Sequence, residues 1–573
     1  MMHRLIGTLT FALAVTFVQC DAIPSDLDWQ TLNDAVRGRL FTAEPLGRPC
    51  FSVFNGDDVE PDEVQCAVVE AKYRNGTIGT DSYANFLHTY NEACASNVTD
   101  QCIPPIDDSG AGSVPGQCNQ GSISERYITV ADAEDVQAAL DFARRTGMTL
   151  SVKASGHDYT ARSSRKGSLA LWTRKLDSLE YVPSFTPFGS SAPPVQAVKI
   201  GAGVNLGEAY EFADRHNATF IGGSSATVTA AGGYTLFGGH GVLTPIYGMG
   251  SDRVLEFRIV TPDGELRTAN EATNPDLFWA LRGAGGAAFG VVLDATFKVE
   301  PIIPLTLSLM RFNPTPANTP PFLSLLMNRS VDWADEGWGG SMSSSTLALI
   351  TPDLDLDAAN RSMEPVAAYV MSQGGSTILE QHPSFYSFYT KYMAPLSSTG
   401  EGTADFGTFR VLPKRLHSSE EGRDAVASTF QTILDAGLVP YIFQTAPTRY
   451  AYAPGSTSVH PAWRDSYWLI GTSISWKSNY AGIEERTRAA SMLKEVSRNL
   501  TALAPEGSVY PNEADPWIEN WRQEFWGSES YDKLLEIKRK YDPHGLINCW
   551  KCVGFDDIQM ETDPAFRCMG AFK

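Results

Sequence analysis

The pattern of apolar and polar residues is most regular between residues 131 and 154. In "ADAEDVQAALDFARRTGM" apolar side chains recur every three or four positions, which predicts an amphipathic helix that begins after Asp132 and stops at Gly147. The short run "TLSVKA" follows as a predicted buried strand, and a loop with Gly156 and His157 leaves it. Because α/β sheets bind ligands at the carboxyl ends of their strands, this loop is a candidate ligand site. The apolar face of the helix consists of Val136, Ala139, Leu140 and Ala143.

Further segments continue this alternation of strand and helix patterns. Residues 195–223 read as a strand, a glycine turn, a helix and a second strand. Residues 254–269 carry strand patterns on both sides of Asp263-Gly264, which predicts a β-hairpin. Residues 274–301 predict a short helix, a glycine-rich loop and a strand. We therefore expect residues 121–302 to form one domain.

The pattern changes after residue 302. Glycine clusters become fewer, and alternating strands such as "TLSLMRF" and "SYWLIGTSISW" are interspersed with amphipathic helices such as "EERTRAASMLKEVSRNL". Residues 303–500 are therefore predicted to form a second domain. Residues 501–573 include a predicted helix over 530–543 and are expected to return to the first domain.

Residues 1–22 predict a secretory signal peptide. One arginine precedes an apolar run from Leu5 to Val18, and Cys20-Asp21-Ala22 offers small residues for cleavage. The run is too short to span a bilayer comfortably, and no later stretch approaches the roughly 18 uninterrupted apolar residues of a membrane helix. The mature protein is therefore expected to be secreted or to stay in the secretory lumen, without a membrane anchor.

The cysteines agree with an oxidising compartment. Of the nine in the chain, one lies in the predicted signal peptide, which leaves an even number and favours disulfides. Five lie in the loop-rich segment 23–120 and three near the C-terminus, so full pairing requires at least one bridge between the two ends. A zinc site at Cys549 and Cys552 is the alternative, but no second close Cys or His pair completes it. The eight cysteines are Cys50, Cys66, Cys94, Cys102, Cys118, Cys549, Cys552 and Cys568.

Length and charge narrow the class of protein. The 573 residues exceed what one hydrophobic core holds, so two or more domains are expected. The formal net charge of −21 disfavours nucleic acid, whose phosphates would be repelled. Asn-x-Ser/Thr sequons fit export, and N-glycans are expected at some of them. The sequons start at Asn75, Asn97, Asn217, Asn328, Asn360 and Asn499.

Three loops rich in small residues lie around Gly156, within 222–233 and within 283–290. Backbone without bulky side chains can approach a flat or anionic ligand closely, and successive N–H groups can hold phosphate oxygens. The run "GAGGAAFG" follows a helix and precedes a strand, which is the reverse of the order in a dinucleotide-binding βαβ unit, so NAD is rejected. Three such loops in one region favour a large cofactor with a pyrophosphate.

Four segments, taken in order, resemble one flavoprotein family. They are "VKASGHDYTARSS", "GGSSATVTAAGGYTLFGGHG", "DLFWALRGAGGAAFGVV" and the tail from "YPNEADPW" to "KCVG". Together they resemble the berberine-bridge-enzyme-like branch of the vanillyl-alcohol-oxidase family, and they look most like secreted fungal isoamyl-alcohol-oxidase-like members. The resemblance implies an α+β fold. It would have a two-part PCMH-type FAD-binding domain and an α/β substrate domain with a mainly antiparallel sheet backed by helices.

The resemblance also implies a covalent cofactor. In this family the histidine of the first motif bonds to the 8α-methyl group of FAD, and the matching position is His157. The bond would retain the cofactor in a dilute medium and raise the flavin's potential. A histidine that merely caps a turn is the structural alternative. The other implied cofactor contacts are Ser155, Gly156, Asp158, Tyr159, Gly222, Ser224, Ser225, Thr227, Val228, Gly232, Gly233, Gly238, Gly239, Asp252, Val292 and Asn512.

This chain departs from many relatives at one position. They carry a second tether, a cysteine, where Ser225 stands here, and no cysteine occurs between residues 119 and 548. A single covalent bond to FAD is therefore expected, and oligosaccharides are disfavoured as substrates because the broad sugar oxidases usually carry both tethers. The small Val228 matches a position that admits oxygen to the flavin in relatives, which favours an oxidase.

The implied reaction is oxidation of a small organic alcohol or secondary metabolite. A base removes a proton while hydride passes to flavin N5, and O₂ then accepts the electrons and gives H₂O₂. An FAD-dependent dehydrogenase with another acceptor, an oxidative cyclase, and a flavin-fold glycoprotein without turnover are the alternatives. The candidate catalytic residues are Tyr510, Tyr467, Glu513 and His240.

Overall fold

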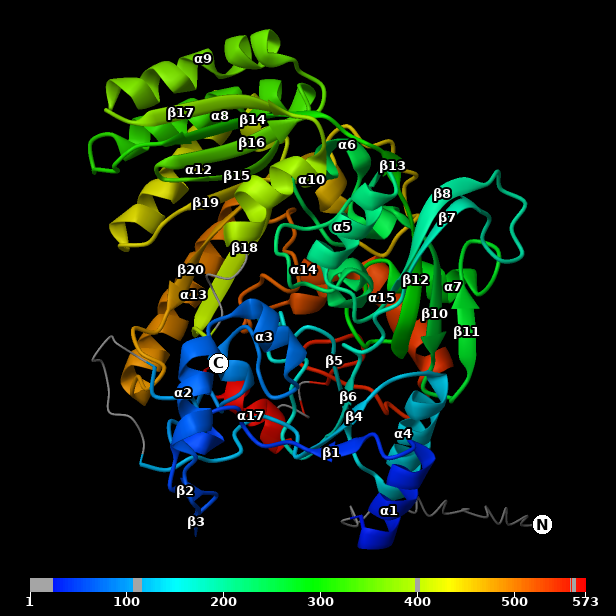
Figure 1. The fold of residues 1–573 in the computed structure, drawn as a ribbon. Helices are drawn as coiled ribbons and strands as arrows, with labels where there is room; N and C mark the ends of the chain where they lie inside the picture. The colour runs from blue at the N-terminus through cyan, green and yellow to red at the C-terminus, as the bar shows by residue number, and fades with distance from the viewer. Residues whose placement is uncertain (1–23, 107–115, 397–401, 557, 559–562, 573) are drawn as a thin grey trace, which may run out of the picture.

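The computed structural model describes residues 24–106, 116–396, 402–556, 558 and 563–572. The described strands form sheets of four, five and seven strands and two short pairs, with helices packed around them (Figure 1). The predicted signal peptide lies outside the described residues. Within the described part of the chain, no helix is both long and apolar enough to cross a membrane.

The helix and strand predicted before His157 are both present. Helix α4 (Ala133–Thr146) begins after Asp132, whose side chain accepts a hydrogen bond from the Asp135 backbone, and it ends at Gly147 in a left-handed conformation. Strand β5 (Leu150–Lys153) pairs in parallel with β6 (Leu169–Trp172). The His157 loop therefore leaves the carboxyl end of a parallel strand, as predicted.

A four-stranded and a five-stranded sheet make up the first part of the fold. The four-stranded sheet has the order β1–β4–β6–β5, and the five-stranded sheet is antiparallel with the order β11–β10–β12–β8–β7. The hairpin predicted at Asp263-Gly264 joins β10 to β11, and Gly264 has a φ of +90°. The bounds are β1 Leu40–Thr42, β4 Arg126–Thr129, β7 Leu179–Phe185, β8 Val195–Gly201, α5 Leu206–Arg215, β10 Val254–Val260, β11 Leu266–Ala269, α7 Pro275–Leu281 and β12 Val291–Lys298.

The seven-stranded sheet is antiparallel throughout. Its order is β17–β14–β16–β15–β19–β20–β18, and helices cover it at the top left of Figure 1. This arrangement and the sheets above confirm the predicted α+β class. The bounds are β14 Leu305–Arg311, α8 Thr319–Asp335, β15 Gly339–Ser343, β16 Thr346–Thr351, α9 Leu356–Ser372, β17 Ser376–His382, β18 Asp405–Pro413, α12 Glu420–Asp435, β19 Tyr441–Gln444, β20 Ser466–Ser475 and α13 Ile483–Leu503.

Alternation along the strands gives this sheet two different faces. Met342 and Ile442 lie in the apolar core shared with the covering helices. Their neighbours Ser341 and Phe443 point to the opposite face, because successive side chains of a strand alternate. That second face meets the rest of the molecule and contributes a wall to the cavity described below.

The segment before residue 120 is more helical than predicted. The sequence predicted loops, yet the structure contains α1 (Asp26–Ala35), α2 (Glu63–Lys72) and α3 (Gly76–Asp81). In α1 and α2 few residues are buried, chiefly Leu32 and Val69, so the apolar periodicity that identifies a helix is weak. Ser25 and Asp62 cap these two helices, and such capping residues were the available signal.

The disulfides join the two ends of the chain, as the cysteine count required. Cys94 bonds to Cys568 of α17 (Pro564–Gly570), the red helix that Figure 1 shows among the blue elements of the N-terminal segment. Cys549 bonds to Cys552, which leaves no thiolates for the alternative zinc site. The remaining bonds are Cys50–Cys66 and Cys102–Cys118.

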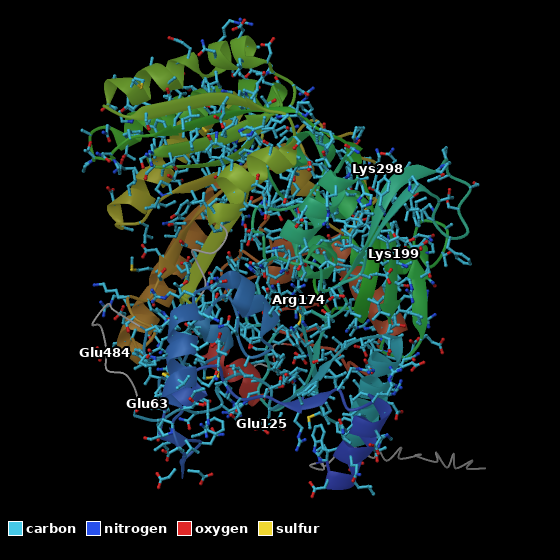
Figure 2. All side chains as sticks on the ribbon, viewed as in Figure 1. Glu63, Glu125, Arg174, Lys199, Lys298 and Glu484 are labelled. Atoms are coloured by element: carbon cyan, nitrogen blue, oxygen red, sulfur yellow. A yellow bond between two sulfur atoms is a disulfide. The ribbon has the colours of Figure 1, made fainter. Side chains whose placement is uncertain are left out.

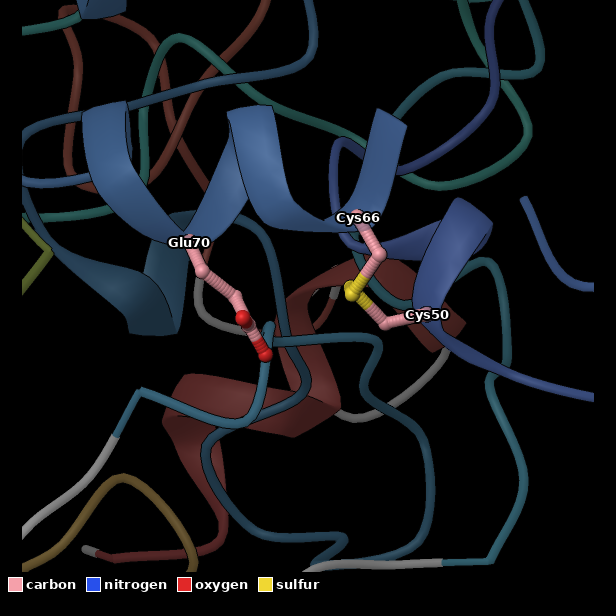
Figure 3. Close-up of side chains that lie close together, drawn as sticks. All are labelled: Cys50, Cys66 and Glu70. Atoms are coloured by element: carbon pink, nitrogen blue, oxygen red, sulfur yellow. A yellow bond between two sulfur atoms is a disulfide. The ribbon is translucent and has the colours of Figure 1, made fainter. Parts of the chain in front are cut away.

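Cys50, Cys66 and Glu70 lie close together, and their residue types are those of a metal site. Figure 3 shows Glu70 on the same side of α2 as the sulfurs of Cys50 and Cys66. Because the two sulfurs are bonded to each other, neither is a thiolate that could hold a metal ion. The cluster is a structural staple.

Removing the end-to-end disulfide is expected to destabilise the protein more than removing a local one. The Cys94–Cys568 bond spans 474 residues and Cys102–Cys118 spans 16. The double variant Cys94→Ala/Cys568→Ala should lose about 2–5 kcal/mol of unfolding free energy, because longer closed loops restrict the unfolded chain more. Urea unfolding compares it with Cys102→Ala/Cys118→Ala. Equal losses in the two double variants would contradict a special contribution from joining the ends.

Charged side chains cover the outer surface. Figure 2 labels Glu63, Glu125 and Glu484, which are exposed and come from three distant parts of the chain. Arg174 is mostly buried instead and pairs with Asp81 and Glu208.

Candidate active site

A cavity of about 400 Å³ lies between the His157 loop, the two larger sheets and the C-terminal tail. Cofactor pockets span about 300–1,000 Å³, so the space suits a ligand of that class. Most residues predicted for the site line it. These are Ser155, Gly156, His157, Asp158, Tyr159, Ser224, Ser225, Val228, Gly232, Gly233, His240, Val292, Tyr510, Asn512 and Glu513.

The backbone of the His157 loop is held from outside by distant segments. The carbonyls of residues 156–159 accept hydrogen bonds from the Leu87 backbone N–H and from the side chains of Asn512, Asn91 and Tyr90. Three of these donors belong to the disulfide-stapled N-terminal segment and one to the tail. The loop is thereby positioned by both ends of the chain, which the Cys94–Cys568 bond joins.

His157 is a neutral, oriented imidazole. Burial, with a smaller contribution from the nearby Lys153 ammonium, lowers the pKa of His157 to about 4. Its Nε2 lies 2.7 Å from Thr227 Oγ1, and the described residues give Nδ1 no hydrogen-bond partner. Nδ1 is therefore the ring nitrogen that is left for a ligand in the cavity.

Glu513 and His240 form a pair on the cavity wall. Glu513 Oε2 lies 3.3 Å from His240 Nε2, and Thr445 Oγ1 lies 3.0 Å from His240 Nδ1. Both ring nitrogens are thus engaged, which fixes the imidazole beside the carboxylate. This pair can accept a proton from a hydroxyl group bound in the cavity.

Tyr510 lies next to the pair but is a poor base. Its hydroxyl donates to the Tyr234 carbonyl at 3.3 Å, and its ring meets the His240 ring edge-on. Burial and the Glu513 charge raise the pKa of Tyr510 well above its ordinary value. A tyrosine in this environment stays protonated.

Two family models match the segments that build this cavity. "FAD binding domain" matches residues 124–270, and "Berberine and berberine like" matches residues 509–548. The chain is 64% identical over 558 residues to "FAD-linked oxidoreductase OXR2" of Pyricularia oryzae, with 96% of each chain covered. It is 48% identical over 554 residues to "FAD-linked oxidoreductase cheF" of Chaetomium globosum, covering 96% of this chain and 89% of that protein. The chain belongs to the FAD-linked oxidoreductases.

The fold of this chain is similar to that of a solved flavoprotein structure. The VAO-type flavoprotein MtVAO615 from Myceliophthora thermophila C1 matches this oxidoreductase with a TM-score of 0.81 and 28% identity, covering 94% of this chain and 97% of that one. The predicted family and α+β fold are therefore confirmed. The protein is an enzyme that binds FAD.

The residues around the cavity fit FAD. A Cβ added to Gly233 or Gly286 would meet no atom closer than 3.4 Å, so a side chain there would project into open space that the ligand needs. Among the lining side chains of the described residues, Arg162 is the sole lysine or arginine. Its Nε and Nη1 donate to the carbonyls of Trp550 and Pro511, which leaves further N–H groups of the guanidinium for an anion such as a pyrophosphate.

Several residues predicted for the site lie elsewhere. Tyr467 packs edge-on against His417, on the helix-covered side of the seven-stranded sheet. The Asp252 carboxylate is bound by Arg464 instead of facing the cavity. Thr227 lies behind the His157 ring rather than on the lining. Gly222, Gly238 and Gly239 have close protein neighbours, and they do not line the cavity among the described residues.

No motif in the sequence predicted several other residues that line the cavity. Arg162 stands five residues after His157, and an arginine within the "DYTARSS" loop was the available signal. Ser341, Phe443 and Thr445 come from or directly follow strands of the seven-stranded sheet, and their sequence carries no motif. Only the folded arrangement brings them to the site.

Proposed function

We propose that this FAD-linked oxidoreductase binds its FAD through one covalent bond at His157 and oxidises a small organic alcohol, with O₂ as the electron acceptor. The observation that carries the proposal is His157 itself. It is a half-buried neutral imidazole on the lining of a cofactor-sized cavity, with one ring nitrogen bonded to Thr227 and the other free of described hydrogen bonds. A histidine that only capped a turn would bond the backbone of its loop, and the described hydrogen bond of this ring goes to the Thr227 side chain instead.

The chain supports one tether and not two. No cysteine occurs between residues 119 and 548, and the described cysteines outside that range are disulfide-bonded. Ser225, which stands where relatives carry a cysteine, lines the cavity. The backbone of residues 155–159 and the Arg162 side chain would then hold the rest of the cofactor.

The bound flavin supplies the hydride acceptor. Glu513, oriented by His240, takes the proton from the substrate's hydroxyl group. Phe443 and Val242 provide apolar contacts on the lining, and Ser341 and Thr445 provide hydroxyls. Because Arg162 is the sole permanent cation among the described lining residues, a neutral substrate is favoured over an anionic one at the Glu513 end.

The small Val228 on the lining supports access of O₂ and therefore an oxidase. The test is an assay of purified protein with primary, benzylic and polyketide alcohols, scored for H₂O₂ and for reduction of an artificial dye. We expect H₂O₂ in a one-to-one ratio with the oxidised alcohol. Rapid dye reduction without H₂O₂ would contradict the oxidase and support the dehydrogenase instead.

We also propose that the enzyme is secreted and N-glycosylated. All six sequon asparagines are exposed, and the disulfides suit an oxidising compartment. Residues 121–302 with 501–573 would form the FAD-binding domain, and 303–500 would form the substrate domain. The seven-stranded sheet, which falls within 303–500, supplies Ser341 and Phe443 to the cavity.

A further inference from the structure

A pair of hydroxyl groups lies behind the His157 ring. Thr227 Oγ1 is 2.7 Å from His157 Nε2, and Ser225 Oγ is 3.4 Å from Thr227 Oγ1. Thr227 is 5% exposed, so bulk water does not replace its contact with the imidazole. The three groups form a short chain, His157–Thr227–Ser225, that we call the hydroxyl chain.

The hydrogen bonds of the hydroxyl chain can point in either of two directions, from His157 to Ser225 or from Ser225 to His157. A neutral imidazole carries one N–H, and a threonine hydroxyl both donates and accepts. If Thr227 donated to Nε2, the proton would sit on Nδ1 and that nitrogen would have no lone pair to offer. If Nε2–H donates to Thr227, and Thr227 donates to Ser225, Nδ1 keeps its lone pair. The position of Ser225 allows this second direction, because its oxygen lies 3.4 Å from Thr227 Oγ1 and can accept the Thr227 proton.

We infer that Thr227 is the positioning residue for covalent attachment of FAD, and that Ser225 completes its effect. This inference rests on the proposed bond at His157. The Thr227 hydroxyl selects the tautomer with hydrogen on Nε2 and aims Nδ1 at the cofactor. This chain lacks the cysteinyl bond to FAD that many relatives form at the position of Ser225. Ser225 instead helps to form the bond between FAD and His157.

The attachment step balances with O₂ as the oxidant. A bond forms between Nδ1 and the 8α carbon of FAD, and that carbon loses one C–H bond. The imidazole loses its Nε2 proton, for which the Thr227 oxygen is the nearest acceptor. Two electrons and two protons end on O₂ and give H₂O₂. Burial and the Lys153 charge both disfavour an imidazolium at this position, so an adjacent oxygen that takes the proton matters here.

The test separates attachment from binding. The full chain is purified as wild type, Thr227→Val, Thr227→Ser and Ser225→Ala. Total flavin per protein is measured by absorbance, and the covalent fraction is the flavin that stays with the polypeptide after acid precipitation. Because one oriented hydrogen bond accounts for about a tenfold effect at most, Thr227→Val is expected to lower the covalent fraction roughly five- to tenfold while total flavin stays within about twofold. Thr227→Ser should be linked like wild type, and Ser225→Ala should fall between them.

Thr445→Val is the matched control. It removes a buried hydroxyl from the other histidine of the cavity, His240, and should leave the covalent fraction unchanged. A Thr227→Val protein linked as fully as wild type would overturn the inference. If Thr227→Val binds no flavin, the inference is tested with Ser225→Ala. A Ser225→Ala protein with the same covalent fraction as wild type would then overturn the inference. A wild-type protein without covalent flavin would instead refute the bond at His157, so the two failures are distinguishable.

Discussion

Glu513→Gln is expected to lower the rate at which substrate reduces the flavin about a hundred- to ten-thousand-fold, the usual contribution of a positioned general base. Glutamine has nearly the same shape and keeps a contact with His240, but it cannot accept the hydroxyl proton. Stopped-flow mixing with a substrate alcohol without O₂ measures this rate directly. The flavin content should stay unchanged, because Glu513 is proposed to contact the substrate and not to hold the cofactor.

Tyr467→Phe is the control for this prediction. Tyr467 was an equal candidate from the sequence, but it contacts His417 on the far side of the sheet, and its removal should leave the rate unchanged. A Glu513→Gln enzyme that reduces its flavin at the wild-type rate would contradict the assignment of the base. The same rate loss in Tyr467→Phe would show that the variants act through stability and not through proton transfer.

Local signals predicted the parts of the fold that depend on neighbours in sequence. The helix capped by Asp132 and Gly147, the strand before His157 and the Asp263-Gly264 hairpin each follow from spacing and turn chemistry within about 20 residues. The odd number of cysteines at each end likewise required a bridge between the ends. These elements can be predicted because capping residues, apolar spacing and turn residues act over short stretches of sequence.

The site was harder to predict because long-range contacts decide which residues reach it. Tyr467 and Phe443 belong to neighbouring strands of one sheet, and alternation alone would put both on the same face, because Phe443 pairs with Leu469. A register shift in the pairing of β18 with β20 leaves Tyr467 without a partner, and its side chain packs in the helix-covered core while Phe443 lines the cavity. No local pattern states which face of that sheet meets the FAD-binding domain. Asp252 illustrates the same limit, since its partner Arg464 is distant in sequence.

The second large effect is expected at His157. His157→Ala removes the imidazole but leaves the surrounding cradle, including Gly233, Gly286 and Arg162, in place. The variant should therefore still bind FAD reversibly, and its flavin should lack the extra redox potential that the proposed covalent bond would confer. The Asn512 hydrogen bond to the carbonyl of residue 157 is made to the backbone and should survive the substitution.

His157→Gln is a matched variant that keeps a polar side chain of similar reach toward Thr227. It should behave like His157→Ala, because an amide nitrogen is not a nucleophile for this bond. Retention of covalent flavin in either variant would mean that another side chain forms the bond.

The most direct test of the central claim is mass spectrometry of the flavin-containing peptide after acid precipitation and proteolysis of the wild-type protein. We predict one yellow peptide that contains residues 153–162, with its flavin attached to His157, and none from His157→Ala. A wild-type precipitate that is colourless, with all flavin in the supernatant, would contradict the account.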